Sequence, residues 1–91
     1  MQFMVIERFL SGPQAVLERY NERGRMLPDG LIYIDSWLDE AGSVCFQLME
    51  TSDRALLAEW SSKWDDLVAI EIVPVYRSAE FWATYSTTSQ F

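Results

Sequence analysis

The chain has 91 residues, 49% of them hydrophobic and 14% aromatic, which suits one folded domain over residues 1–91 and leaves no room for a second core. Its net charge of −7 argues against binding to nucleic acids or to anionic membrane surfaces, where clusters of Lys and Arg make the contacts. Because the chain has no histidine, it excludes Ser-His-Asp and Cys-His nucleophile activation and nearly all zinc sites.

Strand-like and helical segments follow one another in the order β-α-β-β-α-β, with a short helix at the end. The strand-like segments are rich in Val, Ile, Tyr and Phe and span residues 2–9, 30–37, 43–50 and 67–76. The helical segments span residues 11–24, 51–64 and 78–86. Ser11 and Gly24 suit the two ends of the first helix, and Asp39 to Gly42 predicts a hairpin between the second and third strands.

The two longer helices carry the same apolar pattern, displaced by 40 residues. On a helix wheel, each pattern covers an arc of about 100°. The residues are Val16, Leu17, Tyr20 and Gly24 in the first helix, and Leu56, Leu57, Trp60 and Trp64 in the second. The first and third strands share this displacement, so the chain is predicted to consist of two similar βαβ halves.

Two interlocked βαβ halves predict an α+β, ferredoxin-like βαββαβ fold with a four-stranded antiparallel sheet. Right-handed crossovers place the first and third strands in the centre and the other two at the edges. Pro74 in the fourth strand agrees with this order, because proline is tolerated on an edge strand. Both longer helices would then cover one face of the sheet and leave the other face open.

Side-chain alternation sorts the strand residues into two faces. The even-numbered positions are uniformly apolar and are expected to meet the helices as the core: Met4, Ile6, Ile32, Ile34, Val44, Phe46, Leu48, Val68, Ile70 and Ile72. The odd-numbered positions mix apolar side chains with three acids and an amide and are expected on the open face: Phe3, Val5, Glu7, Tyr33, Asp35, Trp37, Cys45, Gln47, Met49, Ala69, Glu71 and Val73.

An open face with Tyr, Trp, Met and Phe is too apolar to remain in water. A second copy packing sheet to sheet would cover it, so we expect a homodimer through the open face. A cleft would remain where this packing is incomplete.

Four stretches resemble a bacterial family of domains of unknown function (DUF3303-like): MQFMVIERF, PDGLIYIDSW, VCFQLMETSDRALLAEW and WDDLVAIEIVPV, which together span nearly the whole chain. That family resembles the dimeric α+β barrel superfamily, whose small ferredoxin-like subunits pair through their open sheet faces. The resemblance implies the fold and the dimer more than an activity. The superfamily includes cofactor-independent monooxygenases, isomerases, haem-degrading enzymes and effector-binding domains, and fold analogy alone does not choose among them. The haem-degrading branch is disfavoured, because its usual axial histidine is missing.

The candidate catalytic groups are the acids of the expected open face, Glu7, Asp35 and Glu71. Carboxylates confined against aromatic surface have raised pKa values and can act as general bases. The alternative is a solvated rim or ion pairs with nearby arginines, which is the commoner fate of such acids. A Mg²⁺ or Ca²⁺ site is a weak prediction, because these acids lie on separate strands without a loop motif. No metal and no cofactor is predicted.

The candidate ligand-binding residues of the same face are Tyr33, Trp37, Gln47 and Cys45. The aromatic rings would hold a flat apolar ligand, and the amide would bind a carbonyl or hydroxyl group. Packing at a dimer interface favours the same aromatic residues. Nothing in the sequence lowers the pKa of Cys45, so an inert buried thiol is expected.

Two further aromatic groups stand outside this face. Trp60 and Trp64 continue the apolar arc of the second helix, so they are expected in the core, with Asp65 and Asp66 off that arc. Phe81, Trp82 and Tyr85 share a face of the last helix. They would pack on their own domain, close the mouth of the cleft or exchange onto the partner subunit.

The sequence therefore predicts a homodimeric domain that binds a small, largely apolar or aromatic molecule. The alternative function is a cofactor-independent enzyme of the monooxygenase or isomerase type with Glu7, Asp35 or Glu71 as general base. A single cysteine, no signal peptide and no apolar run of about 20 residues favour a cytoplasmic location.

Overall fold

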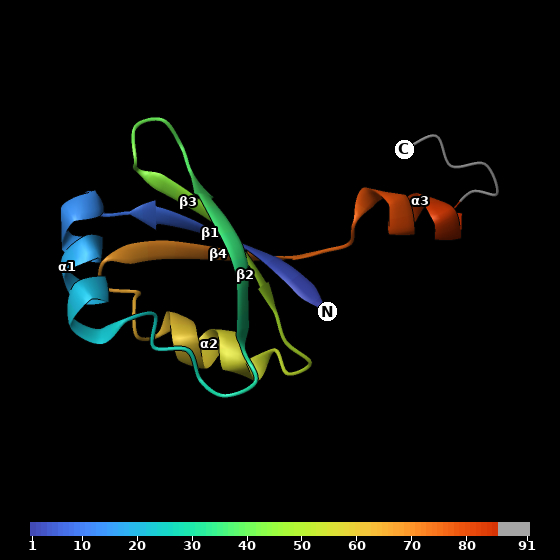
Figure 1. Ribbon diagram of the computed structural model, residues 1–91, viewed down its shortest axis with the longest axis horizontal. Helices are drawn as coiled ribbons and strands as arrows, with labels where there is room; N and C mark the ends of the chain where they lie inside the picture. The colour runs from blue at the N-terminus through green and yellow to red at the C-terminus, as the bar shows by residue number, and fades with distance from the viewer. Residues whose placement is uncertain (86–91) are drawn as a thin grey trace.

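The structure is a computed structural model that describes residues 1–85 (Figure 1). The strands are β1 (Gln2–Phe9), β2 (Ile32–Leu38), β3 (Val44–Glu50) and β4 (Val68–Val75). The helices are α1 (Pro13–Arg23), α2 (Ala55–Ser61) and α3 (Ser78–Tyr85). All predicted elements are present, but α2 ends earlier than expected, before Trp64. Ser86, predicted as the last residue of the third helix, lies outside the described residues.

The four strands form one antiparallel sheet in the order β2-β3-β1-β4. This order and the element sequence confirm the predicted ferredoxin-like α+β fold. Pro74 lies on the edge strand β4, opposite Phe3, where a missing N–H is tolerated. No helix within residues 1–85 is long and apolar enough to cross a membrane.

Aspartate side chains close the hairpin and begin the second helix. Asp39 Oδ1 accepts hydrogen bonds from the backbone N–H groups of Ser43 at 2.8 Å and Val44 at 3.0 Å, which pins the β2–β3 turn. These bonds hold the pKa of Asp39 below its usual value. Asp53 Oδ1 accepts from the N–H of Ala55 at 3.0 Å in the first turn of α2.

The predicted assignment of faces is wrong for β1 and β3, and also for Ile32 and Ile34 of β2, which are 53% and 41% exposed. Phe3, Val5 and Met49 are at most 2% exposed and belong to the core beneath α2, although they are odd-numbered. The even-numbered Phe46 is 39% exposed on the open face. The prediction held for β4, whose partly buried Ile70 and Ile72 pack against the core. The reason is the register: Val5 pairs with Gln47 and with Ile72, so odd positions of β1 and β3 share a face with even positions of β4.

An irregularity in β2 splits residues that were expected together. Tyr33 pairs with Met49 and Asp35 pairs with Leu48, so the register shifts by one residue between them. This β-bulge puts Tyr33 on the helix-covered face and Asp35 on the open face.

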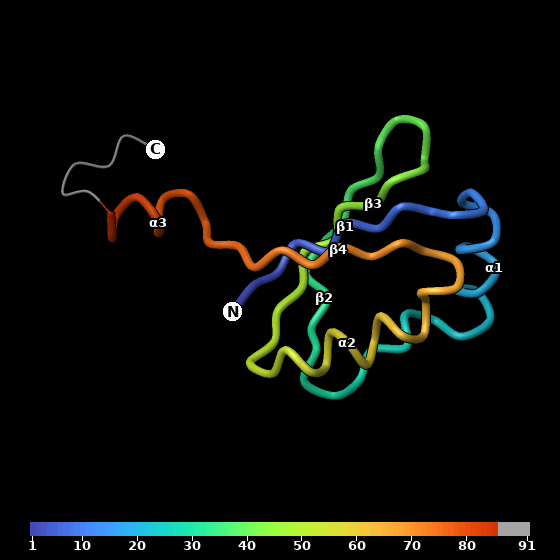
Figure 2. The backbone as a smooth tube through the Cα atoms, turned by 180° about the vertical axis from the view of Figure 1, so that it is seen from behind, coloured from blue at the N-terminus to red at the C-terminus, as the bar shows by residue number. Residues whose placement is uncertain are grey.

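The helices α1 and α2 cover the same face of the sheet but at different depths (Figures 1 and 2). Leu57 and Trp60 of α2 are buried in the core, and so is Trp64 beyond its end. Helix α1 has no buried residue, and its predicted core residues Leu17 and Tyr20 are 50% and 42% exposed. Its apolar stripe therefore does not complete the core, and space remains beneath it.

An ion pair connects α1 to the chain segment that follows α2. Arg19 of α1 donates to both carboxylate oxygens of Asp66, at 2.6 and 2.7 Å, and to the backbone carbonyl of Lys63 at 3.1 Å. The hydrogen bond with Arg19 holds the pKa of Asp66 below its usual value. Asp66 thus links α1 to the turn after α2.

Helix α3 stands apart from the sheet and from the other two helices (Figure 1). It has no buried residue, so of the three placements expected for its aromatic residues, packing on the sheet or on α1 and α2 is not seen. The Phe81 ring stacks on Tyr85, and Trp82 meets both rings edge-on, with centroids 5.2 to 5.8 Å apart.

Candidate ligand-binding site

A pocket of about 460 Å³ lies between α1 and the helix-covered face of the sheet. Its walls are mainly apolar, and its volume is typical of small-molecule sites. Val16, Leu17 and Tyr20 face it from α1, and Trp60 and Trp64 close another side.

The sheet beneath α1 is not closed off as it is beneath α2. Under α2, Phe3 and Met49 belong to the buried core. Under α1, the strand residues line an open pocket together with that helix: Glu7, Phe9, Ser36, Leu38, Cys45 and Gln47.

Glu7 contributes a carboxyl group to the pocket from the centre of the sheet. The residue is only 9% exposed, and no hydrogen bond to its carboxyl is formed within residues 1–85. Burial raises the pKa of Glu7 from 4.5 to about 7, against the opposing effect of the positive charge of Arg25. Near neutral pH this group can therefore both take up and release a proton.

Cys45 lies beside Glu7 as its register partner on β3. Burial and the negative charge of Glu7 raise the pKa of the Cys45 thiol to about 11. A hydrogen bond with Ser36 opposes this shift only in part. The thiol therefore stays protonated at neutral pH, which makes it a poor nucleophile.

Further polar groups of the pocket come from β2 and β3. The buried Gln47 donates from Nε2 to the sulfur of Met49 at 3.3 Å, a weak acceptor. Ser36 shares a hydrogen bond of 2.6 Å with the hydroxyl of Tyr33. These groups supply an amide and two hydroxyls at or next to the pocket.

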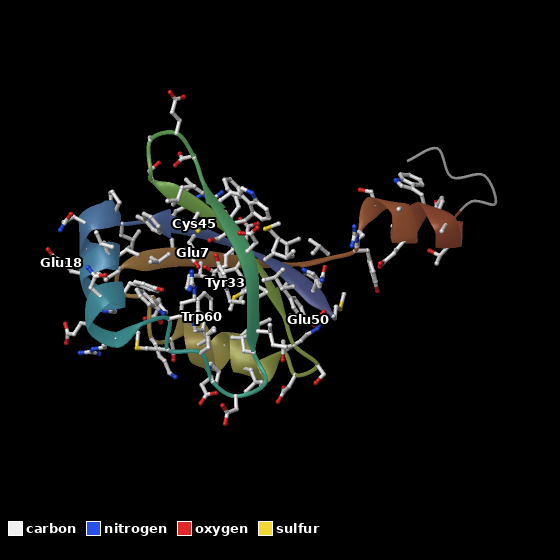
Figure 3. The ribbon with its side chains drawn as sticks, viewed as in Figure 1. Glu7, Glu18, Tyr33, Cys45, Glu50 and Trp60 are labelled. Atoms are coloured by element: carbon white, nitrogen blue, oxygen red, sulfur yellow. The ribbon has the colours of Figure 1, made fainter. Side chains whose placement is uncertain are left out.

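Arg25, which follows α1, is held through its backbone and its side chain. Both indoles, Trp60 and Trp64, donate to its carbonyl oxygen, at 3.0 and 3.1 Å. Its guanidinium carbon lies 3.6 Å from the ring centroid of Tyr33. Figure 3 shows Glu7, Cys45, Tyr33 and Trp60 gathered between the strands and the helices, whereas Glu18 and Glu50 lie away from this region.

The structure brings together four of the seven predicted site residues. Glu7, Cys45 and Gln47 line the pocket, and Tyr33 lies on the same face beneath Arg25. They lie on the helix-covered face, so the prediction of a cleft on the open face is wrong for them.

The other three candidates, Asp35, Trp37 and Glu71, lie on the opposite face of the sheet. Asp35 and Trp37 follow the bulge in β2, and Trp37 pairs with Phe46. Glu71 pairs with Ile6 rather than with Glu7, so the two acids of neighbouring strands point to opposite sides. Glu71 forms an exposed ion pair with Arg8 at 3.3 Å.

Sequence reasoning missed Arg25 and the double role of the tryptophans. Trp60 and Trp64 are buried, as expected of core residues, yet each also forms part of the pocket wall. Their spacing of four residues was a usable signal, because two indole N–H groups on one face require acceptors when buried.

Within residues 1–85, no three Cys, Asp or Glu side chains gather closely enough to hold a metal ion. Among residues 1–85, Glu7 is the one acidic side chain that lines the pocket, whose walls are mainly apolar.

Comparison with known proteins places the chain in a family but supplies no activity. No curated protein and no solved structure matches it. The model of a family described as a domain of unknown function (DUF3303) matches residues 1–89. Since this match covers nearly the whole sequence, the chain belongs to the DUF3303 family.

Proposed function

We propose that the protein binds a small, largely apolar molecule with at least one polar group in the pocket beneath α1. The observation that carries this proposal is the position of Glu7, whose buried carboxyl faces an apolar cavity and forms no hydrogen bond within residues 1–85. Within residues 1–85 no side-chain nitrogen or oxygen is both fully buried and without a hydrogen-bond partner, so the Glu7 oxygens are accessible from the pocket. A ligand there can form a hydrogen bond with the Glu7 carboxyl in mainly apolar surroundings, where such a bond is stronger than in water.

The walls suit an aromatic or alicyclic ligand. Leu17 and Tyr20 of α1 are partly exposed although they face the pocket, so a bound ring would cover them. Each apolar group removed from water contributes about 25 cal/mol per Å². Gln47 and Ser36 offer further hydrogen bonds that would orient the ligand.

The proposal is tested with the neutral fluorescent probe N-phenyl-1-naphthylamine. We expect saturable binding that is accompanied by quenching of tryptophan fluorescence, because Trp60 and Trp64 line the pocket. Leu17→Glu introduces a charge at the pocket wall and should weaken binding about tenfold or more.

The matched control is Leu10→Glu. Leu10 is 61% exposed and does not line the pocket, so the same chemical change there should leave probe binding unaltered. Equal effects of the two substitutions, or none from Leu17→Glu, would contradict the proposed site.

A second candidate function is a cofactor-independent enzyme with Glu7 as general base. The specific observation in its favour is the pKa of Glu7, about 7, which suits proton transfer near neutral pH. The ionised carboxylate would take a proton from an acidic C–H group of the bound molecule and leave an enolate, then return the proton.

This reaction is tested with 2-tetralone in D₂O, by following exchange of its α-hydrogens with NMR. Wild-type protein should accelerate the exchange and Glu7→Gln should not, while both bind N-phenyl-1-naphthylamine. If wild-type protein does not accelerate the exchange, the proposed enzymatic function is refuted and the proposed binding function is unaffected.

We further propose that two copies pair through the open sheet face. Apolar side chains line this face from all four strands: Met4, Ile6, Ile32, Trp37, Phe46, Leu48 and Val73. Trp37 and Phe46 are 52% and 39% exposed, and helices α1 and α2 lie on the other face. Burial against a second copy would remove this surface from water.

The free thiol of Cys45 suits a reducing cytoplasm.

A further inference from the structure

Arg25 is set in place by an unusual stretch of backbone. Gly24 before it and Met26 after it both have positive φ angles, 67° and 59°. For a residue with a side chain such as Met26, this conformation is unfavourable and persists only where the surroundings enforce it. The indoles of Trp60 and Trp64 do so here, because both donate to the carbonyl oxygen between these two residues.

The guanidinium of Arg25 is also fixed, by aromatic rings rather than by acids. It lies over the ring of Tyr33, and Nη1 donates a long hydrogen bond to the hydroxyl of Tyr20 at 3.5 Å. The guanidinium carbon is 5.3 Å from the centroid of the Tyr20 ring. No acidic side chain of residues 1–85 comes within ion-pairing distance of it.

This cation therefore lines an apolar pocket with most of its hydrogen-bond donors available. A guanidinium presents five N–H donors in a planar fork that matches a carboxylate. The carboxyl of Glu7 interacts electrostatically with Arg25 but forms no hydrogen bond with its guanidinium. Apart from Arg25 and Glu7, the walls of the pocket are uncharged and mainly apolar, so a ligand with one negative charge fits better than a polyanion.

We infer that Arg25 binds the anionic group of the pocket's ligand, which makes the ligand class a small, largely apolar carboxylic acid in its ionised form. This inference rests on the proposed binding function and names its ligand class. The ring or chain of the acid lies against Leu17, Trp60 and Trp64, and its carboxylate meets the guanidinium on the Tyr20 side of the pocket, where Arg25 stacks on Tyr33.

The test compares two probes of the same shape, 2-naphthoate and its neutral amide 2-naphthamide, by quenching of tryptophan fluorescence. Wild-type protein should bind the acid about tenfold or more tightly than the amide, as a charge-assisted pair is stronger than a neutral one. Arg25→Gln should remove this preference, and Arg25→Lys should retain part of it, because lysine keeps the charge but loses the planar fork.

Arg23→Gln is the matched control, because it changes the net charge equally. Arg23 lies at the exposed end of α1 and pairs with Glu22 at 3.5 Å, outside the pocket. This variant should keep the wild-type preference for the acid.

The outcomes separate the two proposals. If wild-type protein binds acid and amide equally, the assignment of Arg25 is overturned, but the proposal that the pocket binds a ligand is not. If Arg23→Gln abolishes the preference as fully as Arg25→Gln, the effect is general charge and the assignment is again overturned. If neither naphthalene probe nor N-phenyl-1-naphthylamine binds, the proposed function itself is wrong.

Discussion

Glu7 of β1 lies directly opposite Cys45 of β3 in the antiparallel register, and both side chains face the pocket beneath α1. The pKa values of both groups are raised. Burial is the main cause for Glu7, and burial together with the negative charge of Glu7 is the cause for Cys45. An acid that titrates near neutrality thus stands beside a thiol that does not.

The first prediction concerns the reactivity of Cys45. With a pKa of about 11 its thiolate fraction at neutral pH is small, so iodoacetamide should alkylate the folded protein about a hundredfold more slowly than the urea-unfolded chain. Mass spectrometry of the alkylated protein over time measures both rates. Alkylation of the folded protein at the rate of the unfolded chain would contradict the raised pKa.

The Glu7→Gln variant tests the cause of the thiol's pKa. It removes the negative charge next to Cys45 but leaves the burial, which is the larger cause. Alkylation should therefore become faster than in the wild type while staying slower than in the unfolded chain.

The second prediction is a pH dependence of stability that comes from Glu7. The unfolded chain loses this proton near 4.5, whereas the folded protein holds it up to about 7. Between these values the folded state binds more protons, so the free energy of unfolding falls as pH rises, by up to about 3 kcal/mol from this group. Above about pH 7 this contribution is constant.

The measurement compares urea unfolding of wild-type protein and Glu7→Gln across this pH range. Glutamine does not titrate, so the stability of the variant relative to wild type should rise from pH 4.5 to pH 7 and then level off. Contributions from the exposed acids are the same in both proteins and cancel. A constant difference across the range would mean that the carboxyl of Glu7 is not buried.

The third prediction concerns the two indoles that share the carbonyl of Arg25. Removing one donor leaves the carbonyl with the other, whereas removing both leaves it without a protein donor. Trp60→Phe and Trp64→Phe should therefore be coupled: the double variant should lose about 1 kcal/mol more than the sum of the single losses. Urea unfolding of wild-type protein, the two single variants and the double variant gives a double-mutant cycle. Additive losses from the smaller rings cancel in this cycle. Additive losses would show that the shared carbonyl contributes nothing.

Much of the fold follows from the sequence, because proline, glycine and apolar periodicity act locally. Pro74 on an edge strand and Gly24 at the end of α1 occupy the places that backbone chemistry predicts. The direction of the apolar stripe on α1 was also correct. Its distance from the sheet was not predictable, since that depends on side chains from three separate strands that face α1 across the pocket.

The faces of the strands were harder, because β1 has apolar residues on both sides. Val5 lies in the core and Ile6 on the open face, so neither parity reads as polar. The prediction therefore depended on the polar residues. Glu7 and Gln47 were assigned to the open face, because in sequence the polar residues of a buried pocket resemble those of a solvated face. The register that settles the matter pairs β1 with residues 36 or more positions away and leaves no local signal: Glu7 with Cys45, for example.

The last prediction addresses the open face. Phe46 lies at the centre of the exposed apolar surface on β3, so Phe46→Arg should convert the proposed homodimer into a monomer. Size-exclusion chromatography with light scattering at micromolar concentration measures the change. Leu10→Arg is the control, because Leu10 is more exposed than Phe46 and lies beyond the end of β1. Since Phe46 is already partly in water within one chain, an arginine there should cost the monomer little stability, so a loss of dimer reports on the interface and not on folding. Wild-type protein that is monomeric under these conditions would refute pairing through this face, and the pocket would then have to function within a single chain.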